Sequence, residues 1–151
     1  VIKVTSADEM LETCKNQYLD INFAIFAAAV ADYKPSMPFD KKHKKDGNPL
    51  NITLIENPDI AQELGKLKDE TQIHVGFALE THDGEASAKE KIKRKNLNLI
   101  VLNSLEDPGV GFGQDTNKIT IYDRFEKKFP FELKDKKEVA QDIVKIIQSY
   151  A

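Results

Sequence analysis

Short apolar runs alternate along the chain with stretches in which apolar residues recur at helical spacing. We expect the apolar runs to form strands at residues 1–5, 23–31, 50–56, 73–78 and 97–102. Helical spacing predicts helices that begin near residues 7 and 58, and helices over 84–96 and 135–150. This order is typical of an α/β fold, a Rossmann-like three-layer sandwich with a mostly parallel sheet between helices.

Capping residues mark the starts of two of these helices. Ser6 precedes the first helix, and Asn57 precedes the second, in which Pro58 fits the first helical position. Within the first helix, Cys14 shares the helical spacing of Met10. We therefore expect the Cys14 thiol to face the core, and a nucleophilic role is disfavoured because it needs an exposed thiol beside a base.

A C-terminal β-hairpin extension is predicted from two further strand-like segments, residues 118–122 and 128–133, which lie outside the strand–helix alternation. The hairpin carries Phe125, Phe129 and Phe131. These aromatic side chains either pack on their own sheet or form the contact with a second copy of the chain. The sequence leaves both alternatives open.

Composition limits the classes of protein to which the chain can belong. Its 151 residues are 40% hydrophobic and 31% charged, as expected for one folded domain. A single cysteine excludes a disulfide framework and a Cys-cluster metal site. No apolar run approaches the roughly 18–20 residues that span a bilayer, so no membrane partner is expected. The chain begins at Val1 without a signal-type segment, and we expect it to be part of a longer protein.

The formal net charge of −3 hides two basic segments. Residues 34–45 hold five lysines against Asp40 alone, and residues 89–95 hold four lysines and one arginine against Glu90 alone. An acidic chain is not typical of a nucleic-acid-binding protein, so no nucleic-acid partner is expected. Locally concentrated positive charge indicates a polyphosphate site, and two solvated lysine-rich faces are the alternative.

The two basic segments have different local structure. Residues 33–49 form a long segment interrupted by Pro35, Pro38 and Gly47, which predicts a cationic lid that closes over phosphates. Lys91 and Lys95 stand four residues apart, on one face of the predicted helix. This spacing allows two ammonium groups to converge on one polyphosphate.

Polar residues follow several of the predicted strands. In open α/β sheets, ligands bind beyond the carboxyl ends of the strands. Those ends carry Asp32, Asn57, Glu80 and Asn103, which together predict a functional edge. The helix after Asn57 also presents backbone N–H groups that favour an anion, although Asp59 in its first turn partly offsets this effect.

Standard phosphate and metal motifs are absent from the sequence. It contains no GxxxxGK[ST] and no GxGxxG, and the glycine-rich residues 107–113 lead into no predicted helix. The three histidines lack ligand spacing, so a zinc site is not supported. A Mg²⁺ ion held mainly by substrate phosphates leaves little trace in a sequence.

Five ordered motifs resemble the phosphopantothenoylcysteine synthetase family, the ligase half of the bacterial bifunctional coenzyme A biosynthesis flavoproteins. The motifs lie at Ala27–Tyr33, Lys42–Lys45, Asn57–Ile60, Gly76–Thr81 and Lys95–Asn103. The resemblance covers nearly the whole chain, and the order of the motifs makes it specific. His43 departs from the family's common Lys-Ile-Lys-Lys loop motif, which bears on the packing of that loop.

The resemblance implies a CTP-dependent ligase that acts in two steps in the cytoplasm. The carboxylate of 4′-phosphopantothenate attacks CTP to give an acyl-cytidylate and pyrophosphate, and the amine of L-cysteine then displaces CMP. Mg²⁺ and a homodimer are also implied, with the hairpin at 117–133 as a candidate dimer contact. FMN belongs to the decarboxylase domain that is fused upstream in some members, not to this chain.

The same resemblance implies which residues bind the nucleotide. They are Ala28, Asp32, Lys42, Pro58, Asp59, Ile60, Ala61, Phe77, Lys91 and Lys95. Lys42, on the predicted lid, is also implied to be catalytic by covering the phosphates and the acyl-cytidylate. The ring of Phe77 is expected to pack against the cytosine or the ribose.

One family feature is missing from residues 1–151. The glycine-rich first strand–turn–helix of the family, with its asparagine-containing segment that binds phosphopantothenate, is expected to precede Val1. We therefore interpret residues 1–151 as the C-terminal portion of a single synthetase domain and expect that this portion alone does not complete the ligation.

Two other functions remain open at this point. One is the ATP-using form of the same ligase, and the other is a nucleotide-binding module without chemistry. A Rossmann-type oxidoreductase is disfavoured because the fingerprint glycines are absent.

Overall fold

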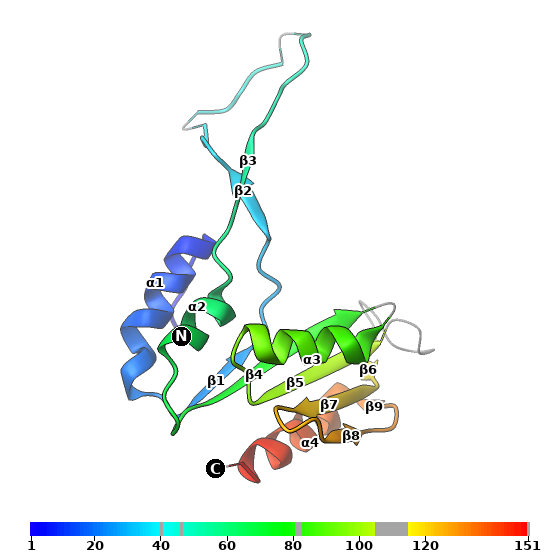
Figure 1. The fold of residues 1–151 in the computed structure, drawn as a ribbon. Coiled ribbons are helices and arrows are strands. Elements are labelled where there is room, and N and C mark those ends of the chain that lie inside the picture. Colours follow the sequence, from blue (N-terminus) through cyan, green and yellow to red (C-terminus); the bar gives the residue numbers. More distant parts are fainter. Residues whose placement is uncertain (40, 46, 81–82, 105–114, 151) are drawn as a thin grey trace.

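The computed structural model describes residues 1–39, 41–45, 47–80, 83–104 and 115–150, and it contains a five-stranded sheet of order β1-β4-β5-β7-β8 (Figure 1). The strands are β1 (Phe23–Phe26), β4 (Ile73–Glu80), β5 (Leu99–Ser104), β7 (Ile119–Asp123) and β8 (Lys128–Pro130). β1, β4 and β5 run parallel, whereas β7 and β8 continue the sheet in antiparallel pairing. The predicted hairpin extension is therefore confirmed.

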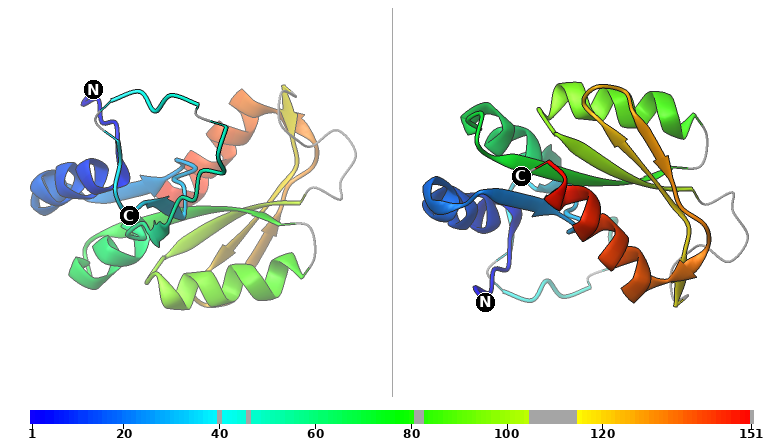
Figure 2. Two further views of the ribbon diagram at one scale, coloured as in Figure 1. Left: turned by 90° about the horizontal axis from the view of Figure 1, so that it is seen from above. Right: turned by 90° about the horizontal axis from the view of Figure 1, so that it is seen from below.

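Helices cover both faces of this sheet (Figure 2). They are α1 (Ala7–Gln17), which continues into a 3₁₀ turn at Tyr18–Asp20, α2 (Ile60–Leu67), α3 (Gly84–Arg94) and α4 (Lys136–Gln148). α3 packs on one face and α4 on the other, which confirms the Rossmann-like three-layer sandwich. Ser6 caps α1 as expected, because its hydroxyl accepts a hydrogen bond of 3.1 Å from the Glu9 N–H.

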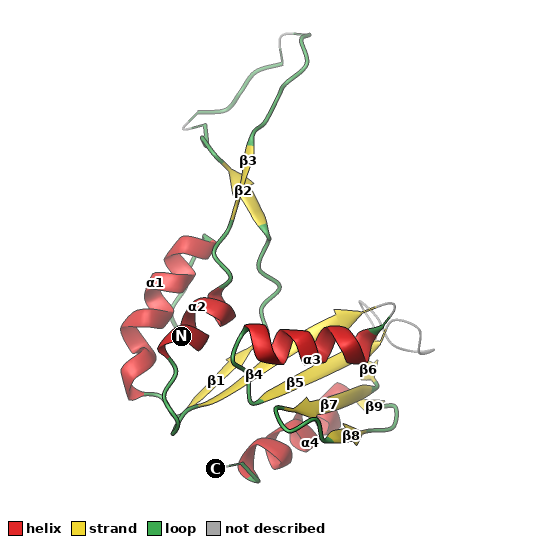
Figure 3. Cartoon of the chain, viewed as in Figure 1, coloured by secondary structure: helices red, strands yellow, loops and turns green. Residues whose placement is uncertain are grey.

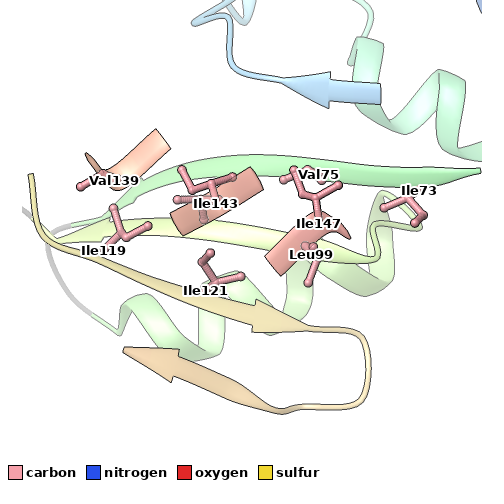
Figure 4. Close-up of a cluster of buried hydrophobic side chains, with 9 residues drawn as sticks. Ile73, Val75, Leu99, Ile119, Ile121, Val139, Ile143 and Ile147 are labelled. Atoms are coloured by element: carbon pink, nitrogen blue, oxygen red, sulfur yellow. The ribbon is translucent and has the colours of Figure 1, made fainter. Parts of the chain in front are cut away.

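Alternation along β5 divides the main core into two clusters. Leu99 and Val101 point to the α4 face, where they join the buried cluster drawn in Figure 4. Ile100 and Leu102 point to the α3 face. Because β5 is buried on both faces, it is a continuous apolar run without polar alternation, as the sequence indicates.

Two short antiparallel ladders lie outside the main sheet (Figure 3). β2 (Tyr33–Pro35) pairs with β3 (Leu54–Glu56), and β6 (Thr116–Asn117) pairs with β9 (Lys134–Asp135). The β2–β3 ladder is the base of a projection from the body of the molecule, visible in Figure 1. We call its described residues, 33–39, 41–45 and 47–56, the arm.

Several predicted elements differ from the structure. Residues 1–5 form no strand, the strand predicted over 23–31 ends at Phe26, and the one predicted over 50–56 starts at Leu54. The alanine-rich residues after Phe26 leave the sheet, so the apolar run there belongs to a cavity wall rather than to a strand. The glycine-rich residues 107–113 lie outside the described residues.

The aromatic residues of the hairpin do not share one environment. Phe129 and Phe131 pack against the α4-face cluster, which supports packing on their own sheet. Phe125, at the turn, is 76% exposed. A dimer contact centred on all three aromatic side chains is therefore not supported by their placement.

A buried histidine lies under the α1 end of the sheet. His74, on β4, is fully buried and shares a hydrogen bond of 2.7 Å between its Nε2 and the Tyr18 hydroxyl. The Phe26 ring contacts His74 edge-on. Burial, with a smaller contribution from the charge of Lys68, lowers the pKa of His74 to about 4.

The low pKa of His74 predicts a loss of stability in mild acid. Below the ordinary pKa of 6.5 the unfolded chain binds a proton at His74, whereas His74 in the folded chain stays neutral until about pH 4. The unfolding free energy is therefore undiminished by His74 above pH 6.5, and it falls as the pH drops toward 4. We expect the unfolding free energy to fall by about 2 kcal/mol more between pH 7.5 and pH 5 in the natural protein than in His74→Gln, as measured by urea denaturation. Parallel pH profiles for the two proteins would contradict this assignment.

Candidate functional site

A cavity of about 390 Å³ lies between the sheet and the helices α1, α2 and α3. Nine of the ten residues predicted to bind a nucleotide line it. They are Ala28, Asp32, Pro58, Asp59, Ile60, Ala61, Phe77, Lys91 and Lys95. They belong to four separate stretches of sequence, which the fold brings to one place. These stretches are the segment after β1, the start of α2, strand β4, and helix α3 with the residue that follows it.

Asn57 joins the two ends of the arm at the cavity. Its side-chain N–H donates to the Ala31 carbonyl at 2.8 Å, and its backbone N–H donates to the Asp32 carbonyl at 2.8 Å. These bonds fix the segment after β1 beside the start of α2. Asn57 does not cap that helix as the sequence suggested, because α2 begins at Ile60 and its N-cap is Asp59.

Asp59 has two structural roles at the cavity wall. Its carboxylate accepts a hydrogen bond of 3.1 Å from the Gln62 N–H at the start of α2, and it pairs with the Lys95 ammonium at 2.9 Å. Burial raises the pKa of Asp59, but the hydrogen bonds from Lys95 and Gln62 outweigh it, so the pKa lies below its usual value. The Asp59 carboxylate is therefore ionised, and it already interacts with Lys95 and Gln62.

The Asp59–Lys95 pair depends on a close approach of α2 to the end of α3. A Cβ atom at Gly65 would lie 2.2 Å from the Lys95 carbonyl oxygen, so only glycine fits there. The Asn96 side chain, in turn, donates a hydrogen bond of 2.9 Å to the Gly65 carbonyl. The backbone contact at Gly65 thus sets the distance between the two helices that form this side of the cavity.

Lys91 is held by a residue behind the cavity. Its ammonium pairs with Glu80, the last residue of β4, and the Ser87 hydroxyl donates to the same carboxylate oxygen at 2.9 Å. The hydrogen bond from Lys91 is the main reason that the pKa of Glu80 lies below its usual value. Lys91 lines the cavity, whereas Glu80 does not.

The charges of the cavity wall are nearly balanced. The aspartate and lysine residues that line it are Asp32, Asp59, Lys91 and Lys95. Both lysines already pair with a carboxylate. The cavity wall therefore offers an anionic ligand little uncompensated positive charge, although lysine N–H groups remain available as donors.

The arm holds the positive charge that the cavity lacks. Lys42, the tenth predicted residue, lies on the arm, is exposed, and is not among the cavity-lining residues. Within the part of the chain that the structure describes, Lys41, Lys42, Lys44 and Lys45 make no ion pair. Lys34, at the base of the arm, pairs instead with Asp8 of α1.

The predicted polar strand ends are brought together only in part. Asp32 and Asn57 meet at the cavity, and Glu80 is linked to it through Lys91. Asn103 is elsewhere, because its side-chain oxygen accepts a hydrogen bond of 3.0 Å from Asn117. Alternation along β4 places Phe77 on the opposite face of the strand from Gly76 and Ala78, and the packing of its ring against a base or ribose stays a prediction.

Sequence reasoning missed part of the cavity lining. The cavity is also lined by Met10, Cys14 and Tyr18, together with Ala24 and Phe26 of β1. Met10 and Cys14 do pack against a third buried cluster, as their helical spacing indicates, but they also line the cavity. This cluster lies between α1 and α2 and consists of Leu11, Tyr18, Ile60 and Leu64. Burial raises the pKa of the Cys14 thiol, which fits a packing role.

Neither a metal cluster nor a membrane span is found in the described residues. No group of three or more His, Cys, Asp or Glu side chains there is placed to hold a metal ion. No helix in the same part of the chain has the length and apolar character needed to cross a bilayer.

Comparison with known proteins identifies the family. The model of the DNA/pantothenate metabolism flavoprotein C-terminal domain matches residues 1–150. The chain belongs to this family. The resemblance inferred from the five motifs is therefore confirmed at the level of the family.

Two curated relatives and one solved structure illustrate the match. The chain is 52% identical over 147 residues to a cysteine/cysteine sulfinic acid decarboxylase from an unknown prokaryotic organism, and covers 41% of it. It is 41% identical over 146 residues to the coenzyme A biosynthesis bifunctional protein CoaBC of Bacillus subtilis, and covers 36% of it. Each match includes 97% of this chain, which thus spans about two fifths of these relatives.

The fold is also that of a solved family domain. The crystal structure of the C-terminal domain of a CoaBC protein superposes with a TM-score of 0.78 at 36% identity. The match covers 99% of this chain and 66% of that domain. This likeness confirms the α/β architecture.

The double role of Asp59 predicts separable effects of two substitutions. Asp59→Ala removes both the helix cap and the ion pair, and we expect it to lower the unfolding free energy by about 1 kcal/mol or more. Asp59→Asn keeps a capping oxygen and loses only the charge, so its loss should be smaller. Urea denaturation of the three proteins measures both values. Equal losses would show that the cap contributes nothing.

Proposed function

We propose that this chain is the nucleotide-holding part of a ligase that joins 4′-phosphopantothenate to L-cysteine in coenzyme A biosynthesis. The observation that carries the proposal is the cavity, because nine residues that the family resemblance assigns to the nucleotide line it together. The family match and the CoaBC relatives support the same assignment. We further propose CTP as the nucleotide, and the cytoplasm as the location.

In the proposed reaction, a phosphopantothenate carboxylate oxygen attacks the α-phosphorus of CTP. The bond to the bridging oxygen breaks, which gives an acyl-cytidylate and releases pyrophosphate. The cysteine amine then attacks the acyl carbon, loses a proton, and displaces CMP to form the amide. This chain would contribute binding and charge to the first step, whose transition state places negative charge on the phosphates.

The residues of the cavity divide this task between them. Lys91 and Lys95 would donate hydrogen bonds to phosphate oxygens from one side. The backbone at Ala28 and along Pro58–Ala61 would contact the base and sugar, and Asp32 would accept a hydrogen bond from the nucleotide. A Mg²⁺ ion held mainly by the phosphates would supply charge that the balanced cavity wall lacks.

The arm is proposed to complete the site. Its exposed lysines, Lys42 above all, would bring positive charge over the phosphates and exclude water. In the structure this lysine is on the arm and away from the cavity lining, so the arm must close, or a second copy must supply it.

A homodimer is supported by the apolar side chains of the arm. Met37, Phe39, Ile52 and Leu54 are each more than half exposed on a projection that the body does not cover. A second copy would bury them. We therefore propose the arm, rather than the 117–133 hairpin, as the main dimer contact.

Residues outside 1–151 are also expected to be needed for turnover. The chain matches only 66% of the solved C-terminal domain of a CoaBC protein. We propose that the phosphopantothenate-binding segment implied by the family lies in the remainder, so that residues 1–151 alone bind the nucleotide without completing the ligation. FMN would belong to the decarboxylase part of such a protein and not to this chain.

Two alternatives keep the same cavity. An ATP-using ligase differs only in how the base is held, and a non-catalytic module would bind nucleotide without turnover. The decarboxylase name of one relative describes a protein of which the chain covers 41%, and the family resemblance assigns flavin-dependent decarboxylation to a different domain.

Nucleotide preference gives a direct test of the proposal. We expect CTP to raise the melting temperature of the intact protein more than ATP does, and pyrophosphate release to require phosphopantothenate. Thermal unfolding with each nucleotide and Mg²⁺, followed by a pyrophosphate assay, measures both. Equal or greater stabilisation by ATP would transfer the assignment to the ATP-using ligase, and binding without pyrophosphate release would favour the module.

Lys42 is predicted to act on the reaction and not on the fold. Lys42→Gln in the intact protein should reduce turnover about 100-fold, since one charge over the phosphates is lost, while the melting temperature stays unchanged. Lys41→Gln is the matched control, because Lys41 is the neighbouring lysine and is also exposed. If both variants lose activity to the same extent, the arm contributes only general charge and Lys42 has no specific role.

A further inference from the structure

Lys91 differs from the other lysines of α3 because a carboxylate outside the cavity holds it at the cavity wall. Its partner Glu80 is the last residue of β4 and lies eleven positions earlier in the chain. The side chains of Lys91 and Glu80 are 27% and 21% exposed, so water screens this pair less than a surface pair. Ser87 donates a hydrogen bond of 2.9 Å to the carboxylate oxygen that accepts from Lys91.

We propose that Glu80 is a positioning residue for the nucleotide, which it serves by holding the Lys91 ammonium at the cavity while Ser87 holds Glu80. The inference rests on the proposed function, because it takes the ligand of the cavity to be a nucleoside polyphosphate. It adds to that function a residue that does not itself line the cavity.

The physical basis is the flexibility of lysine. Its four-carbon stem has many rotamers, and fixing them when a phosphate binds costs conformational entropy. The contact with Glu80 fixes them before binding. An ammonium has three N–H groups, and Glu80 with a single acceptor oxygen uses one, so the others remain free for phosphate oxygens.

The position of Glu80 distinguishes it from Asp59. Asp59 pairs with Lys95 but lines the cavity itself, so its negative charge faces the ligand. Glu80 pairs with Lys91 but does not line the cavity, so its negative charge does not face the ligand. Holding the lysine therefore brings less repulsion toward a phosphate than a carboxylate in the wall would.

Another ion pair of the same helix provides a matched control. Glu85 pairs with Lys89 at 3.0 Å, within α3, and neither residue lines the cavity. Glu80→Ala and Glu85→Ala each remove the carboxylate partner of a lysine on α3. Glu85→Ala also removes the contacts of Glu85 with Lys128 and Tyr122, so it disturbs α3 at least as much. An effect that comes only from loss of helix stability would appear in both variants.

A purely structural pair or a competing carboxylate would behave differently from a positioning residue. If the Glu80–Lys91 pair only joins α3 to the end of β4, its loss changes stability without changing nucleotide binding. If Glu80 competes with the phosphates for Lys91, both Glu80→Ala and Glu80→Gln strengthen binding. Only a positioning role predicts weaker binding in Glu80→Ala and substantial rescue in Glu80→Gln, which keeps the acceptor oxygen.

Calorimetric titration of the intact protein with CTP and with ATP, in the presence of Mg²⁺, tests the inference. With the nucleotide that the natural protein binds more tightly, we expect Glu80→Ala to weaken affinity about tenfold and Glu80→Gln at most about threefold. Ser87→Ala should fall between the natural protein and Glu80→Ala, and Glu85→Ala should equal the natural protein. In the full reaction, the KM for the nucleotide should rise in Glu80→Ala while kcat stays within about twofold.

The outcomes separate this inference from the proposed function. If the natural protein binds neither nucleotide, the proposed function fails and the role of Glu80 fails with it. If it binds one of them and Glu80→Ala binds equally or more tightly, or Glu80→Ala and Glu85→Ala weaken binding alike, only the role of Glu80 is overturned. Should Glu80→Ala not fold, Ser87→Ala decides the question, because unchanged affinity in that variant also overturns the inference.

Discussion

Burial of β5 on both faces is the constraint on which the other layers depend. Leu99 and Val101 on one side, and Ile100 on the other, are almost completely inaccessible to solvent. Each face therefore needs a covering helix, and α4 and α3 supply these covers. Because α3 must lie along β5, the C-terminal half of α3, with Lys91, borders the cavity. The cavity lies beside the end of β1, at Phe26.

The cavity exists because β1 ends early and α2 lies close to the end of α3. β1 has only four residues, and the chain after Phe26 turns out of the sheet instead of filling the space under α2. At the other side, α2 approaches the end of α3 at Gly65, where no larger residue fits. The cavity is lined both by apolar side chains such as Met10 and by charged residues such as Lys91.

The sequence predicted the layers well because burial on two faces leaves a local pattern. The apolar runs of β4 and β5, and the apolar residues at helical spacing in α4, can each be recognised within a short stretch of the sequence. The run after Phe23 was misleading, because alanines suit a cavity wall as well as a strand. Pairings over long separations, such as Glu80 with Lys91 and Asp59 with Lys95, have no local signal, so sequence identified the lysines but not what holds them.

The two basic segments of the chain differ in how far their positive charge is already neutralised by carboxylates. All five cations of residues 89–95 pair with carboxylates, so that segment contributes directed N–H donors rather than surplus charge. The exposed lysines of the arm, from Lys41 to Lys45, have no such partners within the described residues. The positive and negative charges of the cavity wall nearly cancel, so the empty cavity attracts the lysines of the arm only weakly. A bound triphosphate would add negative charge there and attract them more strongly. In the proposed function, the arm of this chain or of a second copy would then close after the nucleotide binds, since the nucleotide supplies the negative charge that attracts its lysines.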